Sequence, residues 1–269
     1  MNILITGGHG FIAYNLHLLL KEDHIVFNPG HEELDILNFE KLRGFIDKNN
    51  IDIVIHTAMV GGIRTRVDGP EVCYQNVLMM ENLIACTQKC KLVINLGSGA
   101  EFDRRFDIVG MPECAIYNRV PIDYYGLSKN IIAKRIVNIP NIINLRIFNC
   151  FGKLEKPSKF ISNVIANKPL VIHQDHYMDF FYIKDLYSLI TFYIDNYASF
   201  YIPTNLKDVN CVYNKKYKLT EIADMLHKPY TIIKDGLNKS YTGCGQKIQI
   251  LNLPMIGLEE GLKEFYNAK

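Results

Sequence analysis

The stretch ILITGGHGFIAYNL, residues 3–16, places an apolar run directly before three glycines and a helical pattern directly after them. Glycine adopts backbone angles that other residues avoid, and it lets the backbone approach a phosphate closely. The first turn of a helix offers free N–H groups and a positive partial charge. This order of strand, glycine turn and helix is typical of a dinucleotide-binding motif. It predicts that a diphosphate lies against Gly7, Gly10, Phe11 and Ile12.

Short apolar runs alternate with helical patterns along the first two-thirds of the chain. The runs are rich in Ile and Val, and their near-continuous apolarity suits strands that are covered on both faces. We expect strands at 2–6, 24–27, 52–58, 91–97 and 143–149. The helical patterns between them cover 11–21, 38–48, 71–89 and 124–137. This alternation predicts an α/β fold, with a Rossmann-type doubly wound parallel sheet and right-handed crossovers.

The spacing of the elements loosens after residue 156. We expect 1–156 to form the dinucleotide-binding domain, with parts of 174–205 returning to it, and 157–269 to form a smaller α/β substrate-binding lobe. A strand is expected at 169–174, and polar connections between 195 and 218. The helices expected in this part of the chain lie at 158–167, 183–195, 218–228 and 257–268.

Composition excludes several classes of protein. Of the 269 residues 48% are hydrophobic, and Lys+Arg number 30 against 28 Asp+Glu, a net charge of +2. This balance predicts no partnership with nucleic acid or with an anionic membrane. The first strand begins at once and no apolar stretch approaches the roughly 20 residues of a membrane span, so we expect neither a signal peptide nor a span. Seven scattered cysteines and no His/Cys cluster predict a cytoplasmic protein with reduced thiols and no metal site.

Two motifs carry the chemistry. DYYGLSK, residues 123–129, places Tyr125 and Lys129 on one helix face, one turn apart. An ammonium about 4 Å away stabilises a phenolate by up to about 4 kcal/mol at a dielectric constant near 20, so we expect Lys129 to lower the pKa of Tyr125. Tyr125 would then protonate the alkoxide of a carbonyl reduction, and Lys129 would also hold the nicotinamide ribose. Ser98 in NLGSGA follows the fourth strand and would steady the same oxygen.

The glycine turn, Ser98 and the Tyr125–Lys129 pair together resemble the extended short-chain dehydrogenase/reductase family, which acts on nucleotide-activated sugars. The resemblance extends over most of the chain. It implies a homodimer, because the helix at 71–89 and the helix of Tyr125 usually form a four-helix interface in this family. The further residues that the resemblance assigns to the cofactor are Asp35 and Ile36 in LDILN, Thr57 and Ala58 in HTA, and Asn76.

Within that family the chain is most similar to the GDP-fucose synthase group, which reduces GDP-linked 4-keto-6-deoxy sugars with NADPH. The segments that carry this similarity are AMVGGI (58–63), YQNVLMMENLI (74–84) and SKFISNVI (158–165). The similarity implies a C4 reductase in the synthesis of an activated deoxysugar for surface glycans, with a nucleotide sugar as its substrate.

Two departures from that group concern the substrate. The group couples reduction to 3,5-epimerisation through a cysteine and a histidine, where this chain has Ala100 and Lys159. Because alanine cannot move a proton, we expect reduction without epimerisation, and Lys159 then binds phosphate. An arginine that grips the substrate diphosphate is replaced by Met178, so the leaving nucleotide is open between GDP, which is favoured, and others. The residues expected to contact the substrate are Gly99, Ala100, Asn149, Lys159 and Met178.

The end of the second strand bears on the cofactor. NAD sites usually carry a carboxylate there, which binds the ribose 2′-hydroxyl. Here Asn28 follows the strand, and no acidic residue occurs before Glu32. The missing carboxylate favours NADP(H) over NAD(H). His9 and His31 are candidate partners for a 2′-phosphate.

Three other functions remain open. A 4-epimerase that holds NAD needs only the same three catalytic residues, and a non-catalytic dinucleotide-binding sensor needs only the fold. A 4,6-dehydratase would carry Asp and Glu directly after Ser98, where this chain has Gly99 and Ala100. The retained Tyr125 and Lys129 argue against a sensor, and the missing carboxylate after the second strand argues against the epimerase.

Overall fold

A six-stranded parallel sheet forms the centre of the computed structural model, which describes residues 1–63, 66–166, 168–197 and 204–267. The strands, in spatial order, are β10 (Asp208–Cys211), β6 (Ile142–Ile147), β4 (Leu92–Ser98), β3 (Ile53–His56), β1 (Asn2–Thr6) and β2 (Ile25–Phe27). From β1 the chain passes to β2 on one side of β1, and it then crosses to β3 on the other side. Ligands of such sheets bind at this switch point, beyond the carboxyl ends of the strands.

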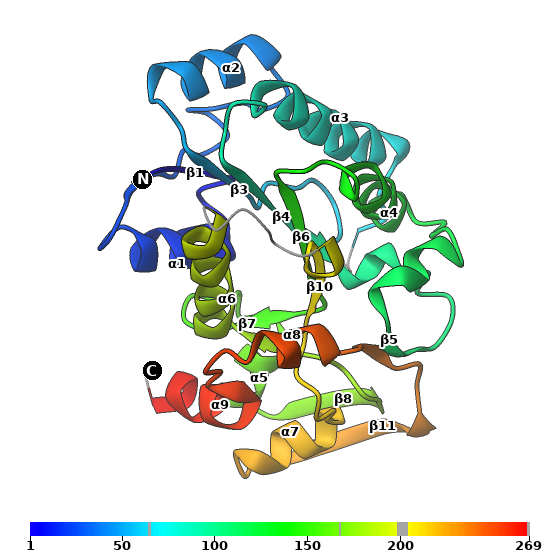
Figure 1. The fold of residues 1–269 in the computed structure, drawn as a ribbon. Coiled ribbons are helices and arrows are strands. Elements are labelled where there is room, and N and C mark those ends of the chain that lie inside the picture. The colour runs from blue at the N-terminus through cyan, green and yellow to red at the C-terminus, as the bar shows by residue number, and fades with distance from the viewer. Residues whose placement is uncertain (64–65, 167, 198–203, 268–269) are drawn as a thin grey trace.

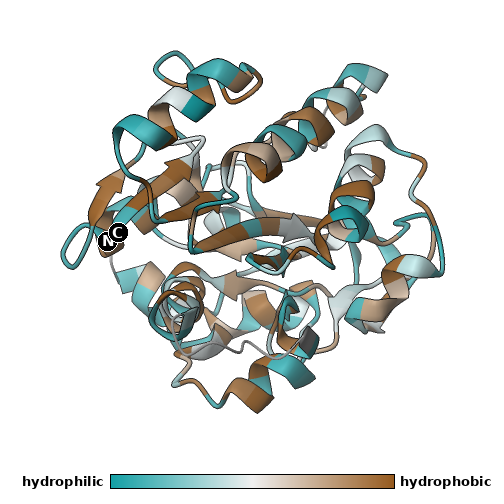
Figure 2. Cartoon of the chain, turned by 45° about the horizontal axis from the view of Figure 1, so that its top comes forward, coloured by the Kyte–Doolittle hydropathy of each residue, from teal (hydrophilic) through white to brown (hydrophobic). Residues whose placement is uncertain are grey.

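Helices cover both faces of the sheet, as Figure 1 shows. Ile3 and Ile5 of β1 share a core with α1 (Phe11–Leu20) and α6 (Ile183–Asn196). Leu4, which points the other way, shares a second core with α2 (Phe39–Lys48), α3 (Pro70–Cys86) and α4 (Tyr124–Ile136). Successive side chains of a strand face opposite sides of a sheet. The continuous apolar runs therefore produce a doubly wound sheet, as predicted, and Figure 2 shows these hydrophobic strands between the helices.

A smaller lobe extends below the carboxyl ends of the strands (Figure 1). Its two-stranded sheets pair β8 (Leu170–Asp175) with β11 (Tyr230–Leu237), β5 (Ile108–Met111) with β12 (Tyr241–Gly243), and β7 (Cys150–Phe151) with β9 (Phe181–Tyr182). Its helices are α5 (Phe160–Ile165), α7 (Leu219–Met225), α8 (Gln246–Leu251) and α9 (Gly257–Asn267). Short 3-10 helices lie at Gly99–Glu101, Glu113–Tyr117 and Thr204–Leu206. One apolar core runs from β1 into this lobe as far as α9.

The segment between 195 and 218 differs from the expectation. It was predicted as polar connections, but within it Asp208–Cys211 forms β10, the edge strand that pairs with β6. The main sheet therefore includes residues 208–211, which lie beyond the segment 174–205 that was expected to return to it. Val209 and Cys211 are fully buried, and the polar residues between them pair with buried partners described below. Residues 167 and 268, at the ends of two expected helices, lie outside the described residues.

Candidate active site

The glycine turn has the geometry of a phosphate-binding site. Gly7 has a φ of +74°, and a Cβ there would lie 2.9 Å from the Cα of Ala58. A Cβ on Gly8 would lie 2.1 Å from the carbonyl oxygen of Asn28. Gly10 caps α1, and no side chain satisfies the first N–H groups of that helix. Backbone N–H groups at an uncapped helix start, beside a wall that admits no side chain, fit the diphosphate of a dinucleotide.

The carboxyl ends of β1 and β3 are tied together beside this turn. The Thr57 hydroxyl donates to the Thr6 carbonyl oxygen at 2.6 Å, and the N–H of Ala58 donates to the Thr6 hydroxyl at 3.2 Å. The same hydroxyl lies 2.9 Å from Nδ1 of His56. Burial, with a smaller contribution from the charge of Lys129, lowers the pKa of His56 to about 3, so this imidazole stays neutral. Thr57 and Ala58 thus sit at the switch point of the sheet.

The other residues predicted to bind the cofactor differ in burial and in their hydrogen-bond partners. Phe11 and Ile12 are half-buried at the start of α1, and the ring of His9 lies against Gly30. Asp35 is partly exposed, accepts a hydrogen bond from the N–H of Leu37 and lies 3.8 Å from His31. The side chain of Ile36 is 5% exposed and packs in the core under α2 and α3, so it presents no side-chain surface there.

Asn76 of α3 anchors a loop and is 2% exposed. Its side-chain oxygen accepts from the N–H of Val60, and its side-chain nitrogen donates to the Val60 carbonyl and to the Ser128 hydroxyl. This fixes the segment 58–63 across the face of Tyr125, where a Cβ on Gly62 would lie 3.0 Å from the ring. Both N–H donors of the amide are used by these partners, so Asn76 supports the segment 58–63, and its predicted contact with the cofactor stays a prediction.

Ser98, Tyr125 and Lys129 converge at the end of β4. Asp123 caps α4 through the N–H of Gly126 at 2.8 Å and so sets Tyr125 in the first turn of the helix. The Lys129 ammonium turns to β4 and donates to the Leu96 carbonyl at 3.1 Å. Ser98 is the last residue of β4, and hydrogen bonding from its hydroxyl stabilises the ionised form of Tyr125. All three side chains are buried.

The acidity of Tyr125 differs from the expectation. Burial dominates and raises the pKa of Tyr125 above its ordinary value of 10.0. Ser98 and the positive charge of Arg104 oppose this rise, whereas the effect predicted from Lys129 is not among the main influences. Burial also lowers the pKa of Lys129 to about 8, against a smaller opposing effect from Glu101. The prediction that Lys129 makes Tyr125 acidic is wrong for the protein alone, because the ammonium is directed at a backbone carbonyl of β4.

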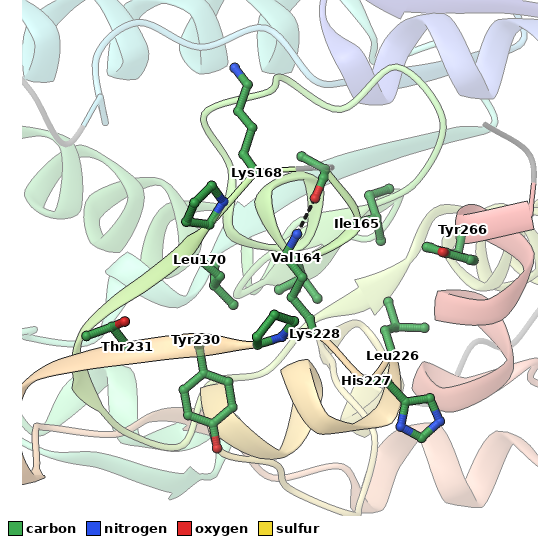
Figure 3. Close-up of a pocket in the computed structure, with 13 residues that line it drawn as sticks. Val164, Ile165, Lys168, Leu170, Leu226, His227, Lys228, Tyr230, Thr231 and Tyr266 are labelled. Carbon is green, nitrogen blue, oxygen red and sulfur yellow. Dashed lines mark hydrogen bonds between the residues drawn. The ribbon is translucent and has the colours of Figure 1, made fainter.

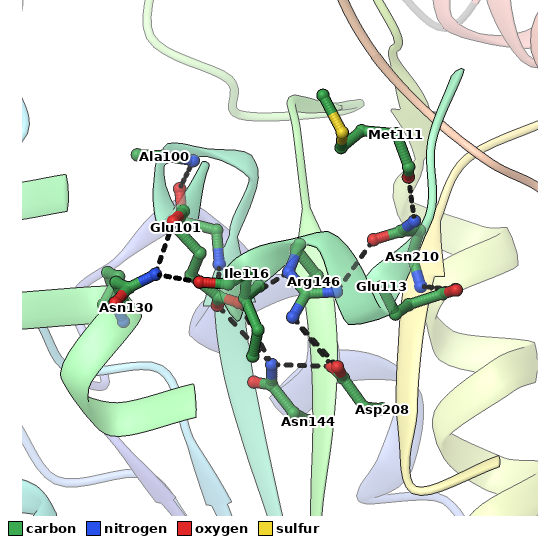
Figure 4. Close-up of polar contacts among 12 residues, drawn as sticks. Ala100, Glu101, Met111, Glu113, Ile116, Asn130, Asn144, Arg146, Asp208 and Asn210 are labelled. Carbon is green, nitrogen blue, oxygen red and sulfur yellow. Dashed lines mark hydrogen bonds and ion pairs between the residues drawn. The ribbon is translucent and has the colours of Figure 1, made fainter. Parts of the chain in front are cut away.

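A buried polar network holds the loop of Ser98 in place (Figure 4). Glu101 is fully buried; one carboxylate oxygen accepts from the Ser98 N–H at 2.9 Å, and the other accepts from Nε of Arg146 at 2.5 Å. Arg146 also donates to Asp208 at 3.0 Å and to Asn210 at 2.9 Å, both on β10. Although burial opposes ionisation of Arg146, the two carboxylates outweigh it and raise its pKa. A buried charge that loses its partner is strongly destabilising, so this network holds together β4, β6 and β10 next to Ser98.

A family model for the NAD dependent epimerase/dehydratase family matches residues 3–207. The chain belongs to this family. Its members are NAD(P)-dependent enzymes, and the chain is an oxidoreductase of this type.

Individual relatives are more distant. The chain is 24% identical to GDP-L-colitose synthase from Yersinia pseudotuberculosis over 257 residues, which cover 85% of this chain and 82% of the relative. Among solved structures, GDP-mannoheptose C4 reductase from Campylobacter jejuni with NADP bound has a TM-score of 0.82 at 16% identity, over 99% of this chain and 97% of the other. dTDP-4-dehydrorhamnose reductase from Bacillus anthracis has a TM-score of 0.82 at 18% identity, over 100% and 98%. These structural similarities establish the Rossmann-type fold.

The residues predicted to contact the substrate include three beside the end of β4 and the start of the lobe. Gly99 and Ala100 follow Ser98, and Ala100 is 1% exposed and packs with Tyr125. Asn149 donates to the carbonyl of Asp179 at 2.9 Å, between the sheet and the lobe.

The other two predicted substrate residues, Lys159 and Met178, differ in their exposure to solvent. Lys159 is exposed at the start of α5, whereas Met178 is 6% exposed and packs in the core. An accessible cation is therefore present at Lys159, while Met178 takes part mainly in packing.

Two residues beside the site were missed by sequence reasoning. Arg104 pairs with Asp123 at 2.7 Å and acts electrostatically on Tyr125. Tyr241 of β12 places its hydroxyl next to Gly99, although β12 lies far from Ser98 and from DYYGLSK in the sequence. Neither residue belongs to a recognisable motif, because Arg104 is brought to Tyr125, and Tyr241 to Gly99, by tertiary packing.

A cavity of about 910 Å³ lies elsewhere, in the lobe between the end of α5 and the start of β11 (Figure 3). The Lys228 ammonium donates to the Ala166 carbonyl at its rim. None of the residues predicted for the site lines this cavity within the described chain. In the described ranges no helix has the length and apolarity to cross a bilayer, and no three His, Cys, Asp or Glu side chains are grouped to hold a metal ion.

Proposed function

We propose that this chain is an NADPH-dependent C4 reductase of a nucleotide-linked 4-keto-6-deoxy sugar, and that it reduces without 3,5-epimerisation. The observation that carries the proposal is the meeting of Ser98, Tyr125 and Lys129 at the end of β4, with Ala100 buried against Tyr125. This site offers one phenol to protonate an oxygen. It offers alanine where a second proton-transfer group would be needed.

The dinucleotide would lie along the carboxyl edge of the sheet. Gly7 and the uncapped N-terminus of α1 would hold its diphosphate, and Thr57 and Ala58 would line its path toward Lys129. When bound, it supplies a hydride to the C4 carbon. Lys129, with a pKa near 8, is largely protonated at neutral pH and would donate to the ribose hydroxyls.

Tyr125 would supply the proton to the C4 oxygen. Its raised pKa keeps the phenol protonated at neutral pH, which suits a general acid. Ser98 would donate a hydrogen bond to the same oxygen and so stabilise its developing negative charge. Arg104 adds positive charge nearby and makes the loss of the Tyr125 proton less costly.

The absence of a proton-transfer group at position 100 supports retention of configuration at C3 and C5. Epimerisation next to a ketone requires one group to remove a proton and another to return one on the opposite face. Ala100 has neither an acidic nor a basic atom. Lys159 is exposed at the start of α5, where it is suited to bind a phosphate as a point charge.

The preference for NADPH rests on Asn28. It follows β2 in place of a carboxylate, and its side-chain nitrogen donates to the Gly8 carbonyl at 3.1 Å. A neutral amide does not repel a 2′-phosphate. A GDP-linked substrate is favoured by the similarity to GDP-L-colitose synthase and to GDP-6-deoxy-D-talose 4-dehydrogenase.

The test is a matrix of two reduced cofactors and three nucleotide sugars. The purified chain is incubated with NADPH or NADH and with GDP-, dTDP- or CDP-linked 4-keto-6-deoxy sugars, and oxidation of the cofactor is followed by absorbance. We expect the highest kcat/KM with NADPH and a GDP-linked sugar. A tightly held NAD that co-purifies, with interconversion of 4-hydroxy sugars and no net cofactor oxidation, would instead identify the 4-epimerase.

A further inference from the structure

Tyr241 is held firmly at the junction between the lobe and the main sheet. Its N–H donates to the Tyr177 carbonyl at 2.8 Å, and its carbonyl accepts from the N–H of Asp179 at 3.1 Å. Its ring packs on Phe148, with 4.9 Å between the ring centroids. Both sides of the backbone and the face of the ring are therefore fixed, which leaves the hydroxyl with a defined position.

That position is beside the catalytic serine. A Cβ on Gly99 would lie 2.6 Å from the Tyr241 hydroxyl oxygen, so only glycine leaves room for it next to Ser98. Hydrogen bonding with the Ser98 side chain stabilises the ionised forms of both Tyr125 and Tyr241. Because Gly99 follows Ser98 directly, the Tyr241 hydroxyl from β12 lies beside the Ser98 residue, on which Tyr125 of α4 also depends. In the protein alone the Tyr125 hydroxyl donates to the sulfur of Met59 at 3.6 Å.

The hydrogen-bonding capacity of a serine hydroxyl assigns a role to each neighbour. A hydroxyl has one proton to donate and two lone pairs to accept with. The N–H of Ala100 already donates to the Ser98 oxygen at 3.1 Å. If Tyr241 donates to the second lone pair, both acceptor sites are filled. The Ser98 proton is then the part of the hydroxyl that is left to donate, and a substrate oxygen held beside Tyr125 can accept it.

We propose that Tyr241 is a positioning residue that donates a hydrogen bond to Ser98 and thereby directs the Ser98 proton at the substrate carbonyl oxygen. The inference rests on the proposed reductase function for its catalytic consequence, but the contact itself does not. It also couples the lobe to the chemistry, because β12 pairs with β5 and Tyr241 bridges to Met178 within the lobe.

The surroundings of Tyr241 keep it a donor. Burial is the largest influence and raises its pKa, with Tyr125 and Glu101 adding to the rise and Arg104 and Ser98 opposing it. Tyr241 therefore retains its proton throughout the neutral range. Filling the Ser98 lone pairs also strengthens the bond that Ser98 donates, because hydrogen bonds in a chain polarise one another.

The decisive experiment is a double-mutant cycle between Tyr241→Phe and Ser98→Ala. Phenylalanine keeps the ring against Phe148 and removes only the hydroxyl. We expect Tyr241→Phe to lower kcat about tenfold with the KM for NADPH unchanged, and to change kcat by less than about twofold when Ser98 is already alanine. Tyr217→Phe is the matched control: its hydroxyl bonds to Glu259 in the lobe, and kcat should stay at the wild-type value.

A second readout needs no turnover. In protein labelled with [13Cζ]tyrosine, the Tyr125 resonance is assigned by its loss in Tyr125→Phe, and its shift at neutral pH reports the hydrogen bonding of the phenol. We expect Tyr241→Phe to move this resonance when Ser98 is present and to leave it in place in Ser98→Ala. Tyr217→Phe should leave it in place in both backgrounds.

Each outcome decides the proposal. Loss of activity of the same size with and without Ser98 would show that Tyr241 does not act through Ser98, and an unchanged kcat with an unmoved Tyr125 resonance would remove any role. If no nucleotide sugar is reduced by the wild-type chain, the proposed function fails, and the NMR cycle alone then decides the contact.

Discussion

Tyr125 and Lys129 lie one turn apart on α4, yet different neighbours set their ionisation. Tyr125 is governed by burial, by Ser98 and by the charge of Arg104. Lys129 is governed by burial, and its ammonium is bound to a carbonyl of β4. The phenol is therefore a proton donor at neutral pH, and the lysine is a buried cation available to a ligand at the carboxyl edge of the sheet.

Removal of the Tyr125 hydroxyl should abolish catalysis without loosening the fold. In Tyr125→Phe we expect kcat to fall by about 100- to 10,000-fold, because the proton to the substrate oxygen is no longer supplied. The affinity for NADPH, measured by calorimetry, should stay within about twofold of wild type. The control is Tyr124→Phe on the exposed side of α4, which should retain wild-type kcat. A Tyr125→Phe variant with near-normal turnover would exclude the phenol as the acid.

Lys129 should leave a signature in the pH dependence of stability. Its pKa is about 8 in the folded chain and near 10.5 when unfolded, so between these values the unfolded state binds more protons and stability rises with pH. Lys129→Met lacks this gain. From pH 8 to 10.5 the free energy of unfolding of wild type should therefore rise relative to Lys129→Met, by at most about 3 kcal/mol. Urea denaturation at several pH values measures the difference, and a constant difference would mean that Lys129 is not desolvated.

Part of the site was predictable at the residue scale, and part was not. Ser98, Tyr125 and Lys129 follow from spacing along one strand end and one helix face. Arg104 reaches Tyr125 from a loop and Tyr241 reaches Gly99 from β12, and no periodicity in the sequence predicts either approach. The acidity of Tyr125 was misjudged because the sequence shows a cation four residues away but not the carbonyl that binds it.

The turn between β1 and α1 depends on glycine at one position above all. A Cβ on Gly8 would lie 2.1 Å from the Asn28 carbonyl and 2.8 Å from the Pro29 carbonyl, so Gly8→Ala must part the turn from the end of β2. We expect a loss of about 1–3 kcal/mol in the free energy of unfolding and a more than tenfold weaker affinity for NADPH. Gly44→Ala in α2 is the control: its Cβ meets nothing within 4 Å, so it should gain about 0.5–1 kcal/mol. Equal effects of the two substitutions would refute the tight turn.

The elements of the sheet were largely predictable because each central strand is apolar on both faces. β10 is the exception. Its sequence, DVNC, alternates polar and apolar residues, and Asp208 and Asn210 are accommodated by buried polar partners, among them Arg146 of β6. A pattern of local hydropathy cannot show that a polar pair has a buried partner 62 and 64 residues earlier. β12 is shorter still and is defined by its pairing with β5.

At the scale of the whole molecule, we propose a homodimer through α3 and α4. These helices pack side by side, and they leave Tyr74 and Ile131 67% and 38% exposed. Exposed apolar side chains on two adjacent helices favour an interface between subunits. Light scattering after size exclusion should give twice the 30.9 kDa of the chain, and Ile131→Glu should halve the mass. Val171→Glu on β8, which is exposed in the lobe, should leave the dimer intact; a monomeric wild type would contradict the proposal.

The central claim is that this site reduces C4 and leaves the neighbouring carbons untouched. It is tested most directly by turnover of a GDP-linked 4-keto-6-deoxy sugar with NADPH in D2O, with the product examined by NMR. A group able to epimerise would exchange the C3 or C5 hydrogen with solvent deuterium. We predict a C4 alcohol that carries no deuterium at C3 or C5 and keeps the configuration of the substrate at both carbons. Deuterium at either carbon, or inversion there, would contradict the account built on Ala100.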